Sequence, residues 1–393
     1  MSALLAALLL AAPTPQVTLS ADGLVSSDPT GGPASGGSNL SGRLLEIVPL
    51  GWAEAALGYS PRLTWAGPTA GRKGNLAFFN DGTLRVEVPL GRTRIRLTEG
   101  ASLGEQDFSI LAQSQRVDPQ APPPPLADRL PAERFLPTFS SATGLELTHQ
   151  ASRSLRGVAT ANFSIGGGLG HDGRSALPLY RSVGGGLLGG WRATTSGELS
   201  TTAGATFSLL SNGARSTTVN LQAGWAERLS KDTTATAAAG LALLDNLQLG
   251  AGGSAPLATV GRQVAPTASL SFISSVALPV GRLALGSSAS ASPALDPLGG
   301  GSYLRGAARL SCRWAISPSL AIAAAASGDR VLSGLLAGAW GGAAELSTSY
   351  RLRRGLTVSA SLRAALLTPT RFLLADEDPM HQFAAVAGVV AEL

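Results

Sequence analysis

Long apolar runs, cysteine and nucleic-acid-binding patterns are scarce or missing in this chain of 393 residues. No run of 18 apolar residues occurs after residue 12, and a membrane-spanning helix requires one. The single cysteine, Cys312, excludes an internal disulfide framework and a multi-cysteine metal site. The isoelectric point is near 10.0. Because no basic helix, aromatic-rich basic patch or zinc spacing accompanies it, nucleic-acid binding is excluded.

What the chain does have is strict alternation of apolar and polar side chains. In residues 354–364 one set is apolar and the other is polar: Leu356, Val358, Ala360, Leu362 and Ala364 against Thr357, Ser359, Ser361 and Arg363. This period of two is typical of a β-strand with one apolar face. The pattern recurs from residue 53 to the last residue, and 49 glycines with only 14% charge accompany it. Strands this long and numerous favour an antiparallel barrel in a membrane over a soluble sandwich.

The alternation predicts sixteen strands, and their connections predict how they are arranged. In the first half they span residues 53–66, 76–89, 92–104, 138–149, 154–166, 182–194, 198–211 and 216–228. In the second half they span residues 233–245, 262–278, 282–290, 303–316, 319–327, 338–352, 356–366 and 382–393. Short connections alternate with longer ones, as the periplasmic turns and extracellular loops of such barrels do. The predicted fold is therefore all-β: a transmembrane antiparallel up-and-down barrel of about sixteen strands, within a range of 14 to 18.

The chain is predicted to form one domain with an amino-terminal extension. Residues 1–12 are expected to be a signal peptide, because an apolar run there ends in small residues. Residues 13–52 are expected to form a flexible leader with a periplasmic segment. Residues 42–49 look like a further strand, but an odd count would put the two chain ends on opposite sides of the membrane, so a periplasmic or edge-pairing role is expected for them. The barrel is therefore predicted to span residues 53–393, with a long Pro-rich outer loop at residues 105–137.

The last strand resembles a known signal. Apolar residues stand at alternate positions up to its end: Phe383, Ala385, Ala387, Val389, Ala391 and Leu393. This pattern resembles the carboxy-terminal insertion signal of bacterial outer-membrane β-barrel proteins of the porin-like kind, which usually end in Phe. The resemblance implies a bacterial outer-membrane location and contacts with outer-membrane lipid and with the barrel-insertion machinery. The sequence is also compatible with a homo-oligomer. Sparse aromatic residues near strand ends, among them Trp65, Trp191 and Trp225, fit the interfacial belt of this family.

The polar face of the strands is expected to line the lumen. Sixteen strands leave room for an aqueous channel, which favours a porin-like channel for passive diffusion of small hydrophilic solutes. The pore-lining candidates are Arg85, Arg94, Arg96, Arg192, Arg309, Arg313, Arg351 and Arg363 against Glu87, Glu146, Glu198 and Glu345. Eight positive charges against four predict a mild anion preference. Alternatively, these charges pair across neighbouring strands and stiffen the wall. The alternative function is a plugged structural or adhesive surface barrel without transport.

The long loop and the histidines are the other candidates for functional sites. In general porins a long acidic loop folds into the channel, and by that resemblance Asp128 and Glu133 are candidates for a constriction. The alternative is a stiff polyproline loop that stands outside. His149 and His171 lack the neighbouring residues that a catalytic centre requires. No enzyme activity, cofactor or metal site is predicted.

Overall fold

A computed structural model describes most of the chain. The described residues are 16–27, 34–67, 75–107, 135–211, 213–248, 259–295, 302–333, 338, 340–367 and 380–392. Within them, eighteen strands form one antiparallel sheet. Among the described residues there is one short helix. No helix in this part of the chain is long and apolar enough to cross a membrane.

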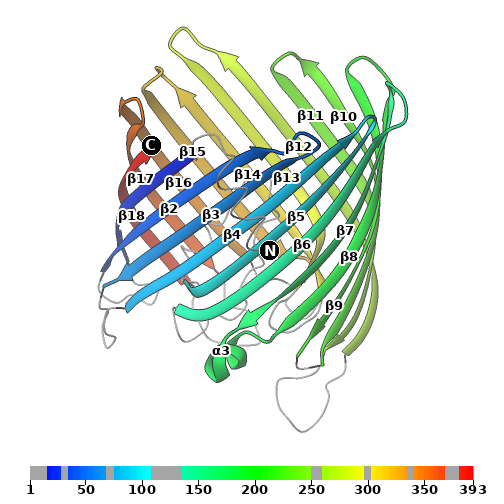
Figure 1. Cartoon of the computed structure of the whole chain (residues 1–393), viewed down its shortest axis with the longest axis horizontal. Coiled ribbons are helices and arrows are strands. Elements are labelled where there is room, and N and C mark those ends of the chain that lie inside the picture. The colour runs from blue at the N-terminus through cyan, green and yellow to red at the C-terminus, as the bar shows by residue number, and fades with distance from the viewer. Residues whose placement is uncertain are drawn as a thin grey trace.

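The strands follow one another around the barrel in chain order (Figure 1). The first nine are β1 (Gln16–Ser26), β2 (Ser35–Pro49), β3 (Glu54–Ala66), β4 (Asn75–Leu90), β5 (Thr93–Asp107), β6 (Phe135–Gln150), β7 (Leu155–Gly168), β8 (Tyr180–Arg192) and β9 (Gly197–Leu210). The other nine are β10 (Arg215–Ser230), β11 (Thr233–Gln248), β12 (Thr259–Ala277), β13 (Arg282–Leu295), β14 (Ser302–Ala315), β15 (Leu320–Val331), β16 (Trp340–Arg353), β17 (Leu356–Leu367) and β18 (Met380–Glu392). The helix α3 (Gly170–Ala176) lies between β7 and β8.

The barrel closes through β1. This strand pairs with β18 from Thr18↔Glu392 to Ser26↔Ala384, and with β2 from Gln16↔Leu45 to Ser26↔Ser35. Figure 1 shows the blue amino-terminal strands beside the red carboxy-terminal one in a ring of tilted strands. Closure leaves the sheet without an edge at this point, which is what a membrane requires of a β-structure.

The expectation that residues 13–52 form a leader was wrong. Both β1 and β2 belong to the wall, so the barrel begins well before residue 53 and has eighteen strands, within the predicted range. The requirement of an even number of strands holds, because the wall gains two strands, β1 and β2, and not one. The segment of β1 was missed because its alternating pattern is short and contains Asp22-Gly23. Residues 42–49 of β2 were recognised as a strand but left out of the wall, because without β1 they made the strand count odd.

The two ends of the barrel differ in their connections, as predicted. At one end all eight connections are tight turns of two to four residues, at residues 50–53, 91–92, 151–154, 193–196, 231–232, 278–281, 316–319 and 354–355. The opposite end has one short connection as well, at residues 211–214 between β9 and β10, which is the exception that the Asn212-Gly213 turn signal predicts. Gly91 and Gly355 have φ values of 63° and 80°, which glycine adopts without the strain that a side chain causes. The helix α3 lies at the opposite end (Figure 1). By the rule for these barrels, the tight turns are periplasmic and α3 is extracellular.

The predicted long loop is only partly described. β5 continues to Asp107 and β6 begins at Phe135, so the strands extend beyond the boundaries expected for residues 105–137. The constriction candidates Asp128 and Glu133 lie outside the described residues. The segment 1–12 and the last residue also lie outside them.

One face of the sheet carries large apolar side chains exposed to the surroundings. Leu187, Leu310 and Leu362 are each more than 60% exposed. In a closed sheet the alternation places such side chains on the outside, where they face lipid. Trp191 and Trp225 lie on this face near the tight turns, and Trp65 lies near the other end. This agrees with the predicted sparse aromatic belt.

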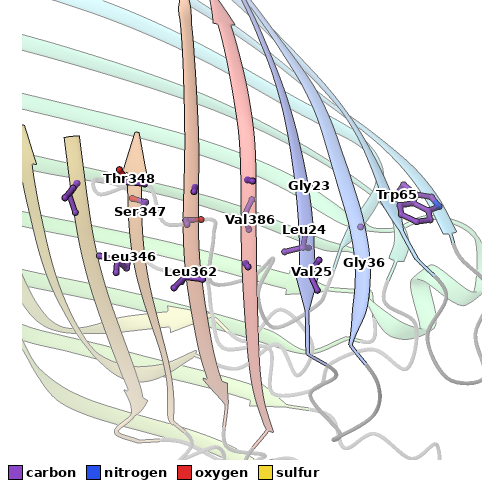
Figure 2. A pocket seen from close by; sticks show the side chains of 16 residues that line it. Gly23, Leu24, Val25, Gly36, Trp65, Leu346, Ser347, Thr348, Leu362 and Val386 are labelled. Carbon is purple, nitrogen blue, oxygen red and sulfur yellow. The ribbon is translucent and has the colours of Figure 1, made fainter. Parts of the chain in front are cut away.

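The outer wall is hollowed where the barrel closes. A groove of about 860 Å³ runs over neighbouring strands from β15 to β3. Figure 2 shows Leu346, Leu362 and Trp65 around it, with Gly23 and Gly36 between them. The hollow exists because the small residues do not fill the space, and the larger residues make its lining apolar. The groove therefore belongs to the lipid-facing surface.

Candidate functional site: the inner face of the barrel

The inner face is the set of side chains that alternate with the exposed apolar ones. All twelve predicted pore-lining residues belong to this set, as their strand partners indicate: Arg85, Glu87, Arg94, Arg96, Glu146, Arg192, Glu198, Arg309, Arg313, Glu345, Arg351 and Arg363. For example, Arg96 lies opposite Glu87 and Glu146, while its neighbour Leu97 lies opposite Val86 and Leu145 on the apolar face.

Glu87 lies at the centre of a group of arginines. Its carboxylate accepts a hydrogen bond from Arg85, and it lies 3.1 Å from Arg94 Nε and 3.2 Å from Arg96 Nε. Arg96 Nη1 also lies 3.4 Å from Glu146 Oε1. Three neighbouring strands thus share three positive and two negative charges. These contacts agree with the alternative that the charges pair across strands, although one positive charge stays uncompensated within the group.

Two of the other ion pairs on the inner face involve predicted lining residues. Arg363 Nε lies 3.3 Å from Glu345 Oε1 on the adjacent strand. Arg156 Nη2 donates to Glu198 Oε1 at 2.9 Å and reaches it across Gly190 of β8. A Cβ atom at position 190 would lie 2.6 Å from the Glu198 oxygen, so glycine leaves the room for this pair. Arg156 is not among the predicted lining residues, because its pairing with Glu198 depends on the register of β7, β8 and β9, which the sequence alone does not show.

Other arginines of the inner face have no ion-pair partner. In the part of the chain that the structure describes, no carboxylate lies within 4.0 Å of Arg192, Arg313 or Arg351. All three side chains are exposed. Each lies within the last three residues of its strand, beside a tight turn. The end of the barrel with the tight turns therefore carries three inner-face arginines that form no ion pair with a described carboxylate.

Between these charges the inner face is made of small polar side chains. On β9 and β10 it consists of Ser200, Thr202, Gly204, Thr206, Thr218, Asn220, Gln222 and Gly224. Such side chains leave the interior of a wide barrel open to water, because porins of 16 to 18 strands enclose an aqueous channel. No group of three or more His, Cys, Asp or Glu residues that could hold a metal ion occurs among the described residues.

His149 and His171 lie at opposite ends of the barrel. His149 Nδ1 lies 2.9 Å from Thr93 Oγ1. The nearby Ser152 hydroxyl accepts hydrogen bonds from the backbone N–H groups of Ser154 and Leu155 in a tight turn. His171 lies on α3 at the other end of the barrel. Among the described residues, these contacts join His149 and Ser152 neither to each other nor to a carboxylate.

The pattern of the barrel strands is also that of a known family. The family model described as "EpsX exopolysaccharide export family" matches residues 53–373, which is well over half of the chain. The chain belongs to the EpsX exopolysaccharide export family. The match covers β3 to β17, so three strands of this wall, β1, β2 and β18, lie outside the range that the family model covers.

Solved structures of similar shape are outer-membrane proteins of other bacteria. OpdK of Pseudomonas aeruginosa is 12% identical, with 97% of this chain and 99% of that chain covered and a TM-score of 0.44. OccK2 (OpdF) of the same species is 14% identical, with 96% and 95% covered and a TM-score of 0.45. OccAB3 of Acinetobacter baumannii is 8% identical, with 96% and 99% covered and a TM-score of 0.42. Likenesses this distant carry no argument about function. No curated protein matches this chain.

Proposed function

We propose that this protein is a channel of the bacterial outer membrane through which an exopolysaccharide leaves the cell. The observation that carries the proposal is the closed wall of eighteen strands, apolar outside and lined inside by small polar side chains. A wall of this size encloses an aqueous channel, and a hydrated polymer needs such a passage through lipid. The name of the family supports a polysaccharide as the cargo.

The charge of the inner face favours an anionic cargo. Arg192, Arg313 and Arg351 have no described carboxylate partner, and rings of basic residues favour anions in a pore. Their place beside the tight turns would attract an anionic polymer at the periplasmic entrance. The predicted anion preference thus rests on these arginines more than on the group around Glu87, where most charges are paired.

Glu87→Gln should raise the preference of the channel for anions over cations. Glu87 contacts three arginines, and one charge removed at about 8 Å in water changes the local anion concentration about twofold. Glu146→Gln is the matched control, because among the arginines Glu146 is paired only with Arg96, and its effect should be smaller. The measurement is the reversal potential under a salt gradient. A shift toward cations in Glu87→Gln would contradict this assignment.

Export is tested in the bacterium that produces the protein. Cells without the protein should lose exopolysaccharide from their surface and retain it inside, and the wild-type chain supplied again should restore the surface polymer. Surface polymer that is unchanged without the protein would overturn the proposal. In that case passive diffusion of small hydrophilic solutes, which would use the same lumen, becomes the better assignment.

The partners follow from the same proposal. Outer-membrane lipid would contact the apolar outer face, and the barrel-insertion machinery would act on β18, whose outward residues alternate up to its end. The plugged or adhesive surface barrel differs from the channel in one measurable property. It would fold into the membrane and pass no ions.

A further inference from the structure

The wall is incompletely paired between β12 and β13. Their ladder runs from Ala277↔Arg282 to Ala268↔Ala291 and ends there. Beyond this point β12 continues to Thr259 and pairs only with β11, and β13 continues to Leu295 and pairs only with β14. A seam therefore opens in the half of the barrel that lies away from the tight turns.

Two prolines explain why the ladder stops. In this register the next positions would place Pro293 opposite Pro266. Leu278 N donates to Gly281 O, so the N–H groups of even-numbered β12 residues point toward β13, because direction alternates along a strand. Pro266 and Pro293 would thus form a hydrogen-bonded pair in which neither residue has an N–H to donate. The seam is encoded by the sequence.

The freed end of the β13–β14 hairpin folds toward the inner face of β10 and β11. Asn246 Nδ2 donates to Ser302 O at 2.6 Å, and Ser302 N donates to Asn246 Oδ1 at 2.8 Å. The Asn246 side chain thus bonds both backbone groups of Ser302, as a neighbouring strand would. The Ser302 hydroxyl also bonds Ser216, and it lies 3.0 Å from Thr218 Oγ1. We call residues 292–295 and 302–305 the flap.

Burial supports this second layer inside the wall. On the inner face of β11, Ala242 and Leu244 have no exposed surface, and on β12 Ala265 is 1% exposed. Tyr303 and Leu304 of the flap are buried as well. Behind them Arg305 forms a buried ion pair with Asp329 of β15, with Nη2 at 2.6 Å from Oδ2. The flap is thus packed on the wall and tied to β15.

We infer that the flap is the constriction of this channel and that Asn246 is the residue that holds it inward. The inference rests on the proposed channel function. The flap forms a layer inside the wall and narrows the passage in its extracellular half. A polymer passes more easily when the flap moves away from the inner face of β10 and β11. Because the seam already separates the flap from β12, no ladder between β12 and β13 has to break when it moves.

The test uses the full chain with Cys312→Ser and Ala265→Cys, so that the only thiol lies beside the flap. Asn246→Ala removes two hydrogen bonds of ordinary strength, which changes an equilibrium by about 30-fold. Labelling of residue 265 by a water-soluble thiol reagent should accelerate by about that factor, and single-channel conductance should increase. Asn162→Ala on β7 is the matched control, since it removes an inner-face amide remote from the flap, and it should change neither.

A second variant keeps the test independent of stability. Thr218→Cys with Ser302→Cys, in the Cys312→Ser background, should form a disulfide that fixes the flap inward, keeps conductance at the lower level and releases it on reduction. Faster labelling in Asn246→Ala without a change in conductance would overturn the constriction. If neither wild type nor variant passes ions although labelling accelerates, the proposed channel function fails instead, and the constriction with it.

Discussion

Deletion of residues 16–49 should abolish the folded barrel. The deletion removes β1 and β2, which leaves β3 and β18 with unpaired edges in place of ladders such as Thr18↔Glu392. Lipid offers no hydrogen bonds to such edges, and each unsatisfied group costs several kcal/mol. We expect the compact, heat-modifiable form to disappear from detergent gels and the chain to aggregate. A deletion variant that folds and stays heat-modifiable would show that these residues are a dispensable leader.

A cross-link separates lost closure from a general folding defect. In a Cys312→Ser background, Ser20→Cys with Val390→Cys should form a disulfide. The two positions are directly paired between β1 and β18, where the barrel closes, and paired Cα atoms lie within disulfide range. Ser20→Cys with Ser359→Cys is the control, since β17 lies one strand further away. Efficient cross-linking between residues 20 and 359, or no cross-linking between residues 20 and 390, would contradict the closure through β1.

Replacement of Arg192, Arg313 and Arg351 by glutamine should remove the anion preference of the channel. These arginines have no described carboxylate partner, so their charge acts on the solution in the lumen. If each charge contributes about twofold, the three together change the ratio of anion to cation permeability by about tenfold. The reversal potential under a salt gradient measures this ratio.

The matched control keeps the charge and changes the side chain. The same three positions replaced by lysine should retain the anion preference, because a pore field depends on charge more than on the shape of the donor. An unchanged reversal potential in the glutamine variant would show that the paired arginines, or none, determine selectivity. A loss of preference in the lysine variant would indicate a binding geometry specific to arginine.

The strands from β3 to β18 could be predicted because their signal is local. A period of two is written into each segment, as in residues 354–364, and it fixes which side chains share a face. For the same reason all twelve predicted lining residues lie on the inner face. The alternation of short and long connections predicts the orientation of the barrel without any knowledge of pairing.

Pairing itself could not be predicted, since partners depend on register and on residues far apart in the sequence. Arg156 and Glu198 meet only because β8 lies between them with Gly190 at the crossing. Likewise Pro266 and Pro293 are ordinary in the sequence, and they gain meaning only when the ladder places them opposite each other. β1 was missed because its pattern is short, and its assignment to the wall follows from pairing on both sides.

We propose above all that the eighteen strands enclose an open, basic passage. The most direct test is the single-channel current of the refolded protein in a planar bilayer, recorded under a salt gradient. We expect discrete open steps with a reversal potential that favours anions. A heat-modifiable, folded protein that inserts into the bilayer and passes no current would contradict this proposal.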